Sequence, residues 1–188
     1  MENLSKNLVI GQSGGPTAVI NASLYGAVKA FRESGADGHV LGMINGIEGF
    51  LADHVMDLST DLSDKELELL KLTPAAYLGS CRYKLPADLD SEVYPAIFDN
   101  FREMNIGYFL YVGGNDSMDT VDKLSRYAEK IGSDVKFIGI PKTIDNDLVL
   151  TDHTPGFGSA ARYVASTVRE ITLDACVYEK KSVTIIEI

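Results

Sequence analysis

The segment with the clearest catalytic potential is residues 141–147, which reads Pro-Lys-Thr-Ile-Asp-Asn-Asp. Asp145 and Asp147 are two positions apart, so one carboxylate can act as a general base while the other partners a metal ion. Lys142 supplies positive charge for a phosphate group. If this segment stood alone, a solvated turn rich in Asp and Asn would be the better interpretation.

A glycine-rich segment, residues 11–17, follows the apolar run 8–10 and reads Gly-Gln-Ser-Gly-Gly-Pro-Thr. Glycines let backbone N–H groups approach an anion, and the N-terminus of a following helix adds its dipole. The segment matches neither G-x-G-x-x-G nor the Walker A sequence. It favours a phosphate-binding loop, with a plain strand-to-helix turn as the alternative.

A second loop, residues 113–117, reads Gly-Gly-Asn-Asp-Ser between an apolar run and a helical pattern. Its glycines can present N–H groups to phosphate, and Asn115 or Asp116 can hold a divalent ion directly or through water, as Mg²⁺ prefers. The alternative is an ordinary helix N-cap, for which Asn, Asp and Ser are common. Three such loops in one chain favour a shared site over three separate turns.

Apolar runs alternate with helical patterns along the chain, which indicates βαβ units. We therefore predict an α/β fold, a Rossmann-like three-layer sandwich with a mostly parallel sheet. Ligands of such sheets bind beyond the carboxyl ends of the strands, where the three loops fall. Residues 47–58 are expected to be irregular or hairpin-like. The predicted strands are 8–10, 39–44, 106–112, 135–140 and 182–188, and the predicted helices are centred on 20–31, 63–72, 91–104, 118–131 and 161–168.

Two domains are expected. Residues 1–165 would bind the phosphoryl donor, and residues 166–188 would begin a sugar-phosphate domain that is truncated here. The predicted last strand is apolar and nothing follows to cover it, a situation that natural proteins avoid. We therefore expect the chain to be a fragment that is inactive in isolation.

The composition is that of an acidic globular protein: 17 Lys and Arg against 27 Asp and Glu give a net charge of −10. This charge argues against binding to nucleic acid or to a membrane surface, which both favour a basic face. Neither a membrane-spanning apolar run nor a signal peptide is evident. Cys81 and Cys176 suit no disulfide framework, so a cytoplasmic location is expected.

Four segments in this order, residues 13–15, 78–82, 113–117 and 141–147, resemble the phosphofructokinase family, and more narrowly its pyrophosphate-dependent branch. The resemblance covers essentially the whole chain. It implies Mg²⁺-dependent, reversible phosphoryl transfer from pyrophosphate to the 1-hydroxyl of fructose 6-phosphate, as a step of glycolysis. It also implies a full-length homo-oligomer, a dimer or a tetramer. The alternatives are an ATP-dependent 6-phosphofructokinase and a non-catalytic phosphate-sensing module on the same fold.

The resemblance also implies roles for individual residues. Asp145 would be the base, with Lys142 and Asp116 as further catalytic groups. Asn115 stands where the family usually has a metal-binding Asp, with Asp147 as a second group near the ion. Donor binding is assigned to Gly14, Gly15, Arg82, Gly114 and Ser117, and binding of the sugar phosphate to Thr143, Ile144 and Asp145.

Two positions bear on the choice of donor, because ATP-using members typically have Gly where this chain has Asp116 and Lys142. A carboxylate at position 116 occupies the room and the negative potential that the α-phosphate of ATP would need. Like charges about 4 Å apart cost roughly 1 kcal/mol in water and about 4 kcal/mol at an intermediate dielectric. Lys142 would stabilise the charge on the transferring phosphoryl group. Together the two residues favour pyrophosphate.

Overall fold

The structure, a computed structural model, describes residues 5–180 and 182–187. The described part is built around a five-stranded sheet with the strand order β3-β2-β1-β4-β5. β1, β2, β4 and β5 are parallel, and β3 runs antiparallel to β2 at one edge. The strands are β1 (Asn7–Gln12), β2 (Val40–Met43), β3 (Val55–Asp57), β4 (Ile106–Gly113) and β5 (Lys136–Pro141).

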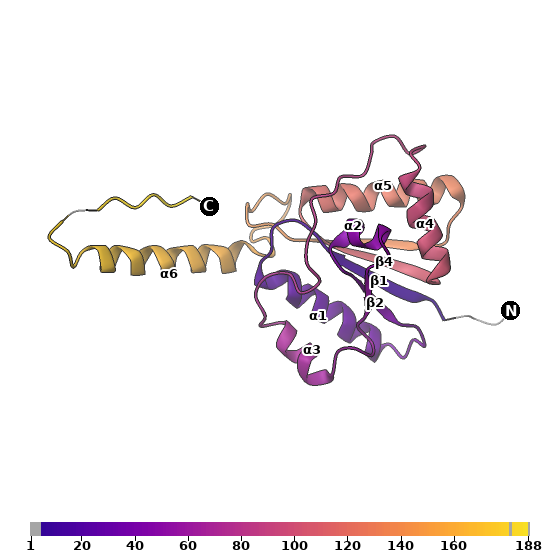
Figure 1. Ribbon diagram of the computed structural model, residues 1–188, viewed down its shortest axis with the longest axis horizontal. Coiled ribbons are helices and arrows are strands. Elements are labelled where there is room, and N and C mark those ends of the chain that lie inside the picture. The colour runs from indigo at the N-terminus through magenta and orange to yellow at the C-terminus, as the bar shows by residue number, and fades with distance from the viewer. Residues whose placement is uncertain (1–4, 181, 188) are drawn as a thin grey trace.

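Helices cover both faces of the sheet (Figure 1), which confirms the predicted three-layer α/β architecture. Helices α1 and α3 pack on one face, and α2, α4 and α5 pack on the other. A sixth helix, α6, leads away from these layers. The helices are α1 (Ala18–Glu33), α2 (Gly46–Leu51), α3 (Asp64–Leu70), α4 (Val93–Glu103), α5 (Asn115–Ile131) and α6 (Phe157–Ala175).

Strand β4 shows how the sequence builds the two cores. Side chains alternate across a strand, so Phe109 faces the core under α4 and α5 while Leu110 faces the core under α1. Aromatic rings dominate the first core, where Phe101 lies with its ring centroid 5.6 Å from that of Phe109. Both faces of β4 are therefore buried, which accounts for its nearly continuous apolar sequence.

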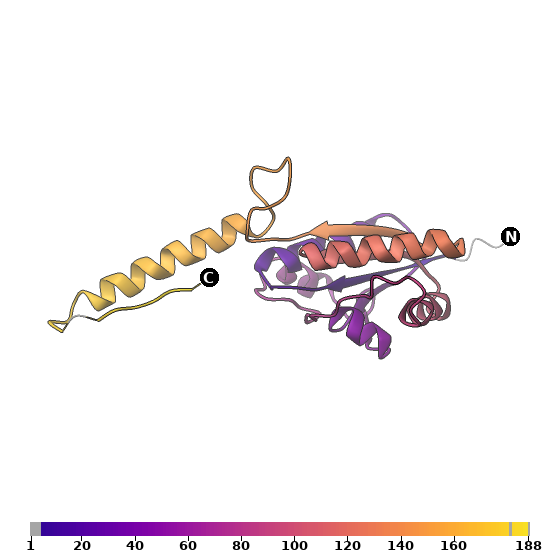
Figure 2. The same ribbon diagram turned by 90° about the horizontal axis from the view of Figure 1, so that it is seen from above.

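The parallel arrangement brings three loops to one edge of the sheet. The carboxyl ends of β1, β4 and β5 point toward the side from which α6 departs (Figure 2). In register, Gln12 of β1 pairs with Val112 of β4, and Gly113 of β4 pairs with Pro141 of β5. The segments that begin at residues 13, 114 and 142 consequently start side by side.

The segment 47–58 differs from the prediction, because it contains most of α2 and the whole of β3. Gly46 and Gly49 lower the helix propensity of α2, which is why the sequence pattern indicates no helix there. Tertiary burial compensates for this propensity: Ile47 and Phe50 are 1% and 0% exposed. Packing against the sheet therefore holds a helix that the local sequence alone does not favour.

The predicted strand at 182–188 is wrong for the residues that can be judged. Residues 182–187 pair with no strand of the described chain, and Val183 and Ile185 are each 90% exposed. An apolar run alone does not make a strand, because a strand needs a neighbour to satisfy its backbone groups. Ile188, the last residue of the predicted strand, lies outside the described residues.

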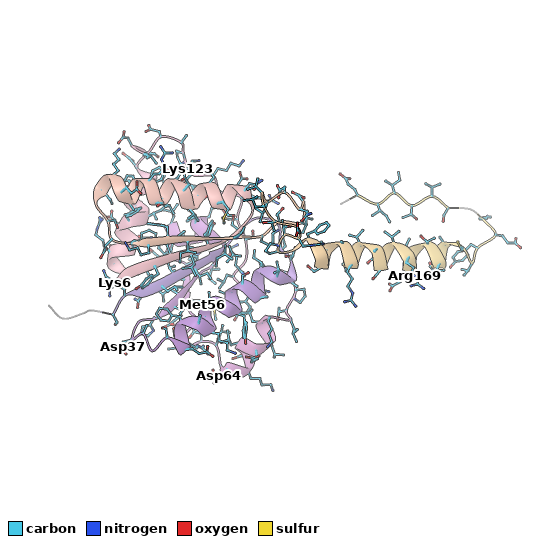
Figure 3. The ribbon with its side chains drawn as sticks, turned by 180° about the vertical axis from the view of Figure 1, so that it is seen from behind. Lys6, Asp37, Met56, Asp64, Lys123 and Arg169 are labelled. Carbon is cyan, nitrogen blue, oxygen red and sulfur yellow. The ribbon has the colours of Figure 1, made fainter. Side chains whose placement is uncertain are left out.

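Residue 165, where the first of the two expected domains ends, lies inside helix α6. No residue of α6 is buried. Figure 3 shows Arg169 on α6 well away from Lys123 on α5 and Asp64 on α3. No described helix is both long enough and apolar enough to cross a lipid bilayer.

Candidate active site

A cleft of about 470 Å³ opens at the carboxyl ends of β1, β4 and β5. It is walled by the three loops that follow these strands and by a fourth segment, residues 81–83. The lining residues are Ser13, Gly14, Gly15, Pro16, Thr17, Cys81, Arg82, Tyr83, Gly114, Asn115, Asp116, Ser117, Lys142, Thr143, Ile144 and Asp145.

The predicted site residues therefore meet in one place, with the exception that Asp147 does not line the cleft. Asp147 contacts the site through Asn115, whose side-chain amide donates a hydrogen bond to Oδ2 of Asp147 at 3.3 Å. Of the lining residues, Tyr83 alone lies outside the segments that the sequence analysis named. It follows directly after Arg82, which is the one signal that pointed to it.

The first loop turns sharply at Gly14, which has φ of +79°, a left-handed conformation that favours glycine. The hydroxyl of Ser80 donates a hydrogen bond to the Gly14 carbonyl at 2.7 Å, and the hydroxyl of Ser13 donates one to the Cys81 carbonyl at 3.2 Å. Two bonds thus hold the segment that carries Arg82 against the glycine loop. Their effect is to fix Arg82 beside the cleft, where its guanidinium can bind phosphate.

Beneath this loop lies a buried polar network that the sequence reasoning missed. Gln12 and Asn21 are both 0% exposed, and the Gln12 amide donates a hydrogen bond to Oδ1 of Asn21 at 3.0 Å. The side-chain oxygen Oε1 of Gln12 accepts a hydrogen bond from the backbone N–H of Leu78, and Oδ1 of Asn21 accepts one from the backbone N–H of Tyr77. Fully satisfied buried networks are rigid, so these two side chains position the loops above them.

The second loop packs tightly where β4 ends. A Cβ added to Gly113 would lie 2.1 Å from Oγ of Ser117 and 2.7 Å from the carbonyl oxygen of Ser13, so only glycine fits there. The N-cap of α5 is Gly114, and it makes no side-chain capping bond, so the plain N-cap interpretation of this loop is not what the structure has. The first N–H groups of a helix largely lack partners within the helix, and residues 114–117, at the start of α5, line the cleft.

The third loop places a buried cation in the cleft. Lys142 is 6% exposed, its backbone N–H donates to the Gly113 carbonyl at 2.8 Å, and its ammonium donates to the Gly15 carbonyl. Desolvation lowers the pKa of Lys142, with the positive charge of Arg82 acting in the same direction and Asp145 opposing both. A lysine held in this way joins all three loops at the cleft.

The rest of the third loop is closed by hydrogen bonds. The N–H of Thr143 donates to the Pro155 carbonyl and the hydroxyl of Thr154 donates to the Thr143 carbonyl, both at 3.0 Å. The backbone N–H of Thr154 donates a further hydrogen bond to the side-chain oxygen of Asn146, also at 3.0 Å. The loop therefore has a defined conformation in which Asp145 is exposed to solvent at the rim of the cleft.

Magnesium can be tested against the side chains that are present. Within the described residues there is no cluster of three or more His, Cys, Asp or Glu side chains that would enclose a metal ion. Asp147 and Asn115 offer one carboxylate and one amide, and Mg²⁺ is commonly bound by one or two carboxylates together with water and substrate phosphates. Hydrogen bonds from Thr143 and Asn115 lower the pKa of the Asp147 carboxyl, which keeps it anionic. The donor set therefore fits a magnesium ion shared with a phosphate ligand.

Asp116 stands in the first turn of α5 and forms an ion pair that sequence reasoning missed. Its Oδ1 lies 3.1 Å from Nζ of Lys84, in the segment that also carries Arg82. No periodicity links these positions, so the sequence carried no signal for the pair.

A mostly parallel sheet whose glycine- and aspartate-bearing loops meet over one cleft defines an α/β protein of the Rossmann-like class. The phosphofructokinase family model matches residues 7–188, and the chain belongs to this family.

Individual relatives show which members of the family this chain is similar to. A protein of Halomonas elongata named pyrophosphate--fructose 6-phosphate 1-phosphotransferase is 45% identical over 171 residues, which are 89% of this chain and 40% of the relative. The crystal structure of the pyrophosphate-dependent phosphofructokinase from Nitrosospira multiformis superposes with a TM-score of 0.82 and 42% identity, over 91% of this chain and 42% of that one. An ATP-dependent 6-phosphofructokinase of Clostridium acetobutylicum is 28% identical over 182 residues, 95% of this chain and 51% of the relative. The chain thus spans about two-fifths of the length of the pyrophosphate-dependent relatives.

Proposed function

We propose that this chain carries the donor site of a pyrophosphate-dependent phosphofructokinase. The reaction is reversible transfer of a phosphoryl group from pyrophosphate to the 1-hydroxyl of fructose 6-phosphate, a step of glycolysis. The observation that carries the proposal is the meeting of Asp116 and Lys142 in one cleft between two glycine loops. The names of the 45%-identical relative and of the 42%-identical structure support the same choice of donor.

The donor is held by backbone and by cations. Gly14, Gly15 and Gly114 present the backbone to the phosphates, and the N-terminal turn of α5, which includes Ser117, adds its dipole. Arg82 binds phosphate oxygens with a planar fork of donors. Lys142 neutralises the charge that spreads over the transferring group, and a phosphate anion bound beside it opposes the lowering of its pKa by burial.

Asp145 acts on the acceptor. Its carboxylate takes the proton of the 1-hydroxyl, the freed oxygen attacks the terminal phosphorus, and the bridging P–O bond breaks to release inorganic phosphate. Thr143 and Ile144 hold the sugar phosphate beside this base. One phosphoanhydride is replaced by one ester, so the reaction runs readily in both directions.

The proposed cofactor is Mg²⁺, with Asp147 and Asn115 as its protein partners. When bound, the ion would supply positive charge that offsets the negative charge of the phosphates. The contribution of this chain is to hold the Asp147 carboxylate ionised and the Asn115 amide in place beside the donor.

The proposal also covers the extent of the donor-binding domain, the location of the protein and its assembly. Residues 1–165 are assigned to donor binding, and the protein is expected to act in the cytoplasm as a homo-oligomer, a dimer or a tetramer. A reducing location is supported by the two free cysteines, Cys81 and Cys176. An assembly is supported by exposed apolar side chains on α6, which include Tyr163 at 71% and Leu173 at 61% exposure.

The test is a donor assay on the protein as its gene encodes it, with fructose 6-phosphate as acceptor. We expect turnover with pyrophosphate and Mg²⁺, and none after chelation of the metal. Faster turnover with ATP than with pyrophosphate would replace this proposal by the ATP-dependent alternative. Tight pyrophosphate binding without any transfer would favour the phosphate-sensing module instead.

A further inference from the structure

The ion pair between Lys84 and Asp116 stands at the edge of the cleft. Nζ of Lys84 lies 3.1 Å from Oδ1 of Asp116, and the side chains are 70% and 62% exposed. Asp116 lines the cleft whereas Lys84 does not. An ion pair this exposed contributes little to folding, about 0–1 kcal/mol, so its main effect falls on the charge of the cleft.

The charges that line the cleft raise a difficulty for any phosphate donor. Arg82 and Lys142 are positive, and Asp116 and Asp145 are negative, so the formal charges of the lining side chains cancel. A bare carboxylate at position 116 would repel pyrophosphate as well as the α-phosphate of ATP, because both are anions. A residue that is to exclude ATP alone needs its charge compensated from outside the cleft.

Lys84 is placed to provide this compensation, because its neighbours in the chain are anchored. The Cys81 carbonyl accepts a hydrogen bond from Ser13 at 3.2 Å, and the Leu85 carbonyl accepts one from the ammonium of Lys123 at 3.0 Å. The backbone on both sides of Lys84 is therefore tied to the glycine loop and to α5. The ammonium of Lys84 is thus presented to Asp116 by a fixed segment.

We propose that Lys84 is a positioning residue for donor choice, which acts through Asp116. It holds the carboxylate and cancels its charge toward pyrophosphate, while the bulk of Asp116 still stands in the way of a nucleotide. The inference rests on the proposed function and adds a specificity-determining residue to it. The required behaviour is specific: removing the charge of Lys84 must weaken pyrophosphate binding only while residue 116 carries a carboxylate side chain.

The first experiment measures the Kd of magnesium pyrophosphate by titration calorimetry on the protein as its gene encodes it. We expect Lys84→Met to raise the Kd about 3- to 10-fold at low salt and Lys84→Arg to stay within about twofold of wild type. The loss should shrink as ionic strength rises, because the uncompensated charge is exposed and screened. A matched control is Lys130→Met, since Lys130 pairs with Asp90 and joins the same connecting segment to the far end of α5. This control should leave the Kd unchanged.

A double-mutant cycle with Asp116→Asn then separates compensation from direct contact. In the Asp116→Asn background, Lys84→Met should have no further effect on the Kd. If the weakening persists in that background, Lys84 contacts the phosphate itself and the inference is overturned. An unchanged Kd for Lys84→Met in the wild-type background overturns it as well, while the proposed function stands. A wild-type protein that does not bind pyrophosphate removes the proposed function and this inference together.

Discussion

The side-chain amide of Asn115 donates a hydrogen bond to Oδ2 of Asp147 at 3.3 Å, and this contact joins the first turn of α5 to the loop after β5. Two loops that are far apart in sequence thereby present one carboxylate and one amide to the same space. The neutral amide allows the two side chains to lie this close, because it bonds to the carboxylate where a second carboxylate would repel it.

Asn115→Asp should therefore make the site depend on metal. Two carboxylates this close repel each other, so the melting temperature without metal should fall and the pKa of one carboxyl should rise. With Mg²⁺ the second carboxylate is a stronger ligand, and we expect metal affinity to increase about tenfold. Calorimetric titration with MgCl₂, alongside thermal melts with and without the metal, measures both effects. A variant with unchanged metal affinity would argue against Asn115 as a metal partner.

Asp145→Asn should lower turnover with pyrophosphate by about 10²- to 10⁴-fold, because the amide cannot accept the hydroxyl proton. Binding of fructose 6-phosphate and pyrophosphate should persist, since the side-chain shape is kept. Steady-state kinetics with a binding titration check both statements. Asp152→Asn, in the same loop but outside the cleft, is the control and should retain turnover within about twofold. Similar turnover of the two variants would remove Asp145 from its proposed role.

Asp116→Gly should raise activity with ATP, because the change removes the side chain whose bulk stands in the way of its α-phosphate. The measured quantity is the ratio of kcat/KM for ATP to kcat/KM for pyrophosphate. Asp122→Gly introduces the same residue further along α5, outside the cleft, with a similarly small loss of helix propensity of about 0.3 kcal/mol. Its donor ratio should match that of wild type. An unchanged ratio in Asp116→Gly would show that this carboxylate does not select the donor.

Lys142→Met should change the pH dependence of stability. Desolvation lowers the pKa of Lys142 below its ordinary value of 10.5, so the native state loses this proton before the unfolded state does. The unfolded state then binds more protons between the two pKa values, and the free energy of unfolding of the wild type rises with pH in that window. The methionine variant lacks this rise.

Urea denaturation from pH 7 toward pH 10.5 measures the difference between wild type and Lys142→Met. We expect the wild type to gain stability relative to the variant as pH increases. Lys130→Met is the control, because the Asp90 side chain raises the pKa of Lys130 and moves its titration above this window. Its difference from wild type should stay constant. A constant difference for Lys142→Met too would mean that burial does not depress the pKa of Lys142.

Gly113→Ala and Gly114→Ala should behave differently although they are neighbours. The new methyl group at 113 would meet Ser117 and Ser13 at less than van der Waals distance, and we expect a loss of about 1–3 kcal/mol in the free energy of unfolding. At 114 the nearest atom is the Lys142 carbonyl oxygen at 3.7 Å, so stability should change little. Equal stabilities of the two variants in urea denaturation would contradict the packing described at the end of β4.

Much of the fold was predictable because it follows from strong local patterns. The strands β1, β4 and β5 follow from apolar runs in the sequence. Strands β1 and β4 are largely buried, whereas the edge strand β5 has no buried residue. The parallel order of the three strands brings the loops that follow them to one edge. This is why the residues of three loops were expected together and are found together. The sequence pattern failed at α2, where burial of Ile47 and Phe50 outweighs two glycines, and at 182–187, where an apolar run has no strand to pair with.

The residues that support the site were less predictable than the residues that line it. Gln12 and Asn21 act through a hydrogen-bond network that forms only when the chain is folded, so no residue spacing in the sequence predicts it. The same holds for Lys84, whose partner comes from another segment of the chain. Sequence motifs identified groups that can touch phosphate, whereas the groups that orient or neutralise them depend on tertiary contacts.

Helix α6 and the layered sheet are expected to unfold in separate steps. With none of its residues buried, its backbone hydrogen bonds gain little from the two cores and can open by fraying, without loss of the sheet. Amide hydrogens of α6 should exchange with solvent far sooner than those of β4. Ellipticity at 222 nm should accordingly decline on heating before the near-ultraviolet signal of the buried tyrosines Tyr94 and Tyr111 is lost. A single melting temperature is then not a property of the whole chain, and the optical probe decides which part of the molecule is measured.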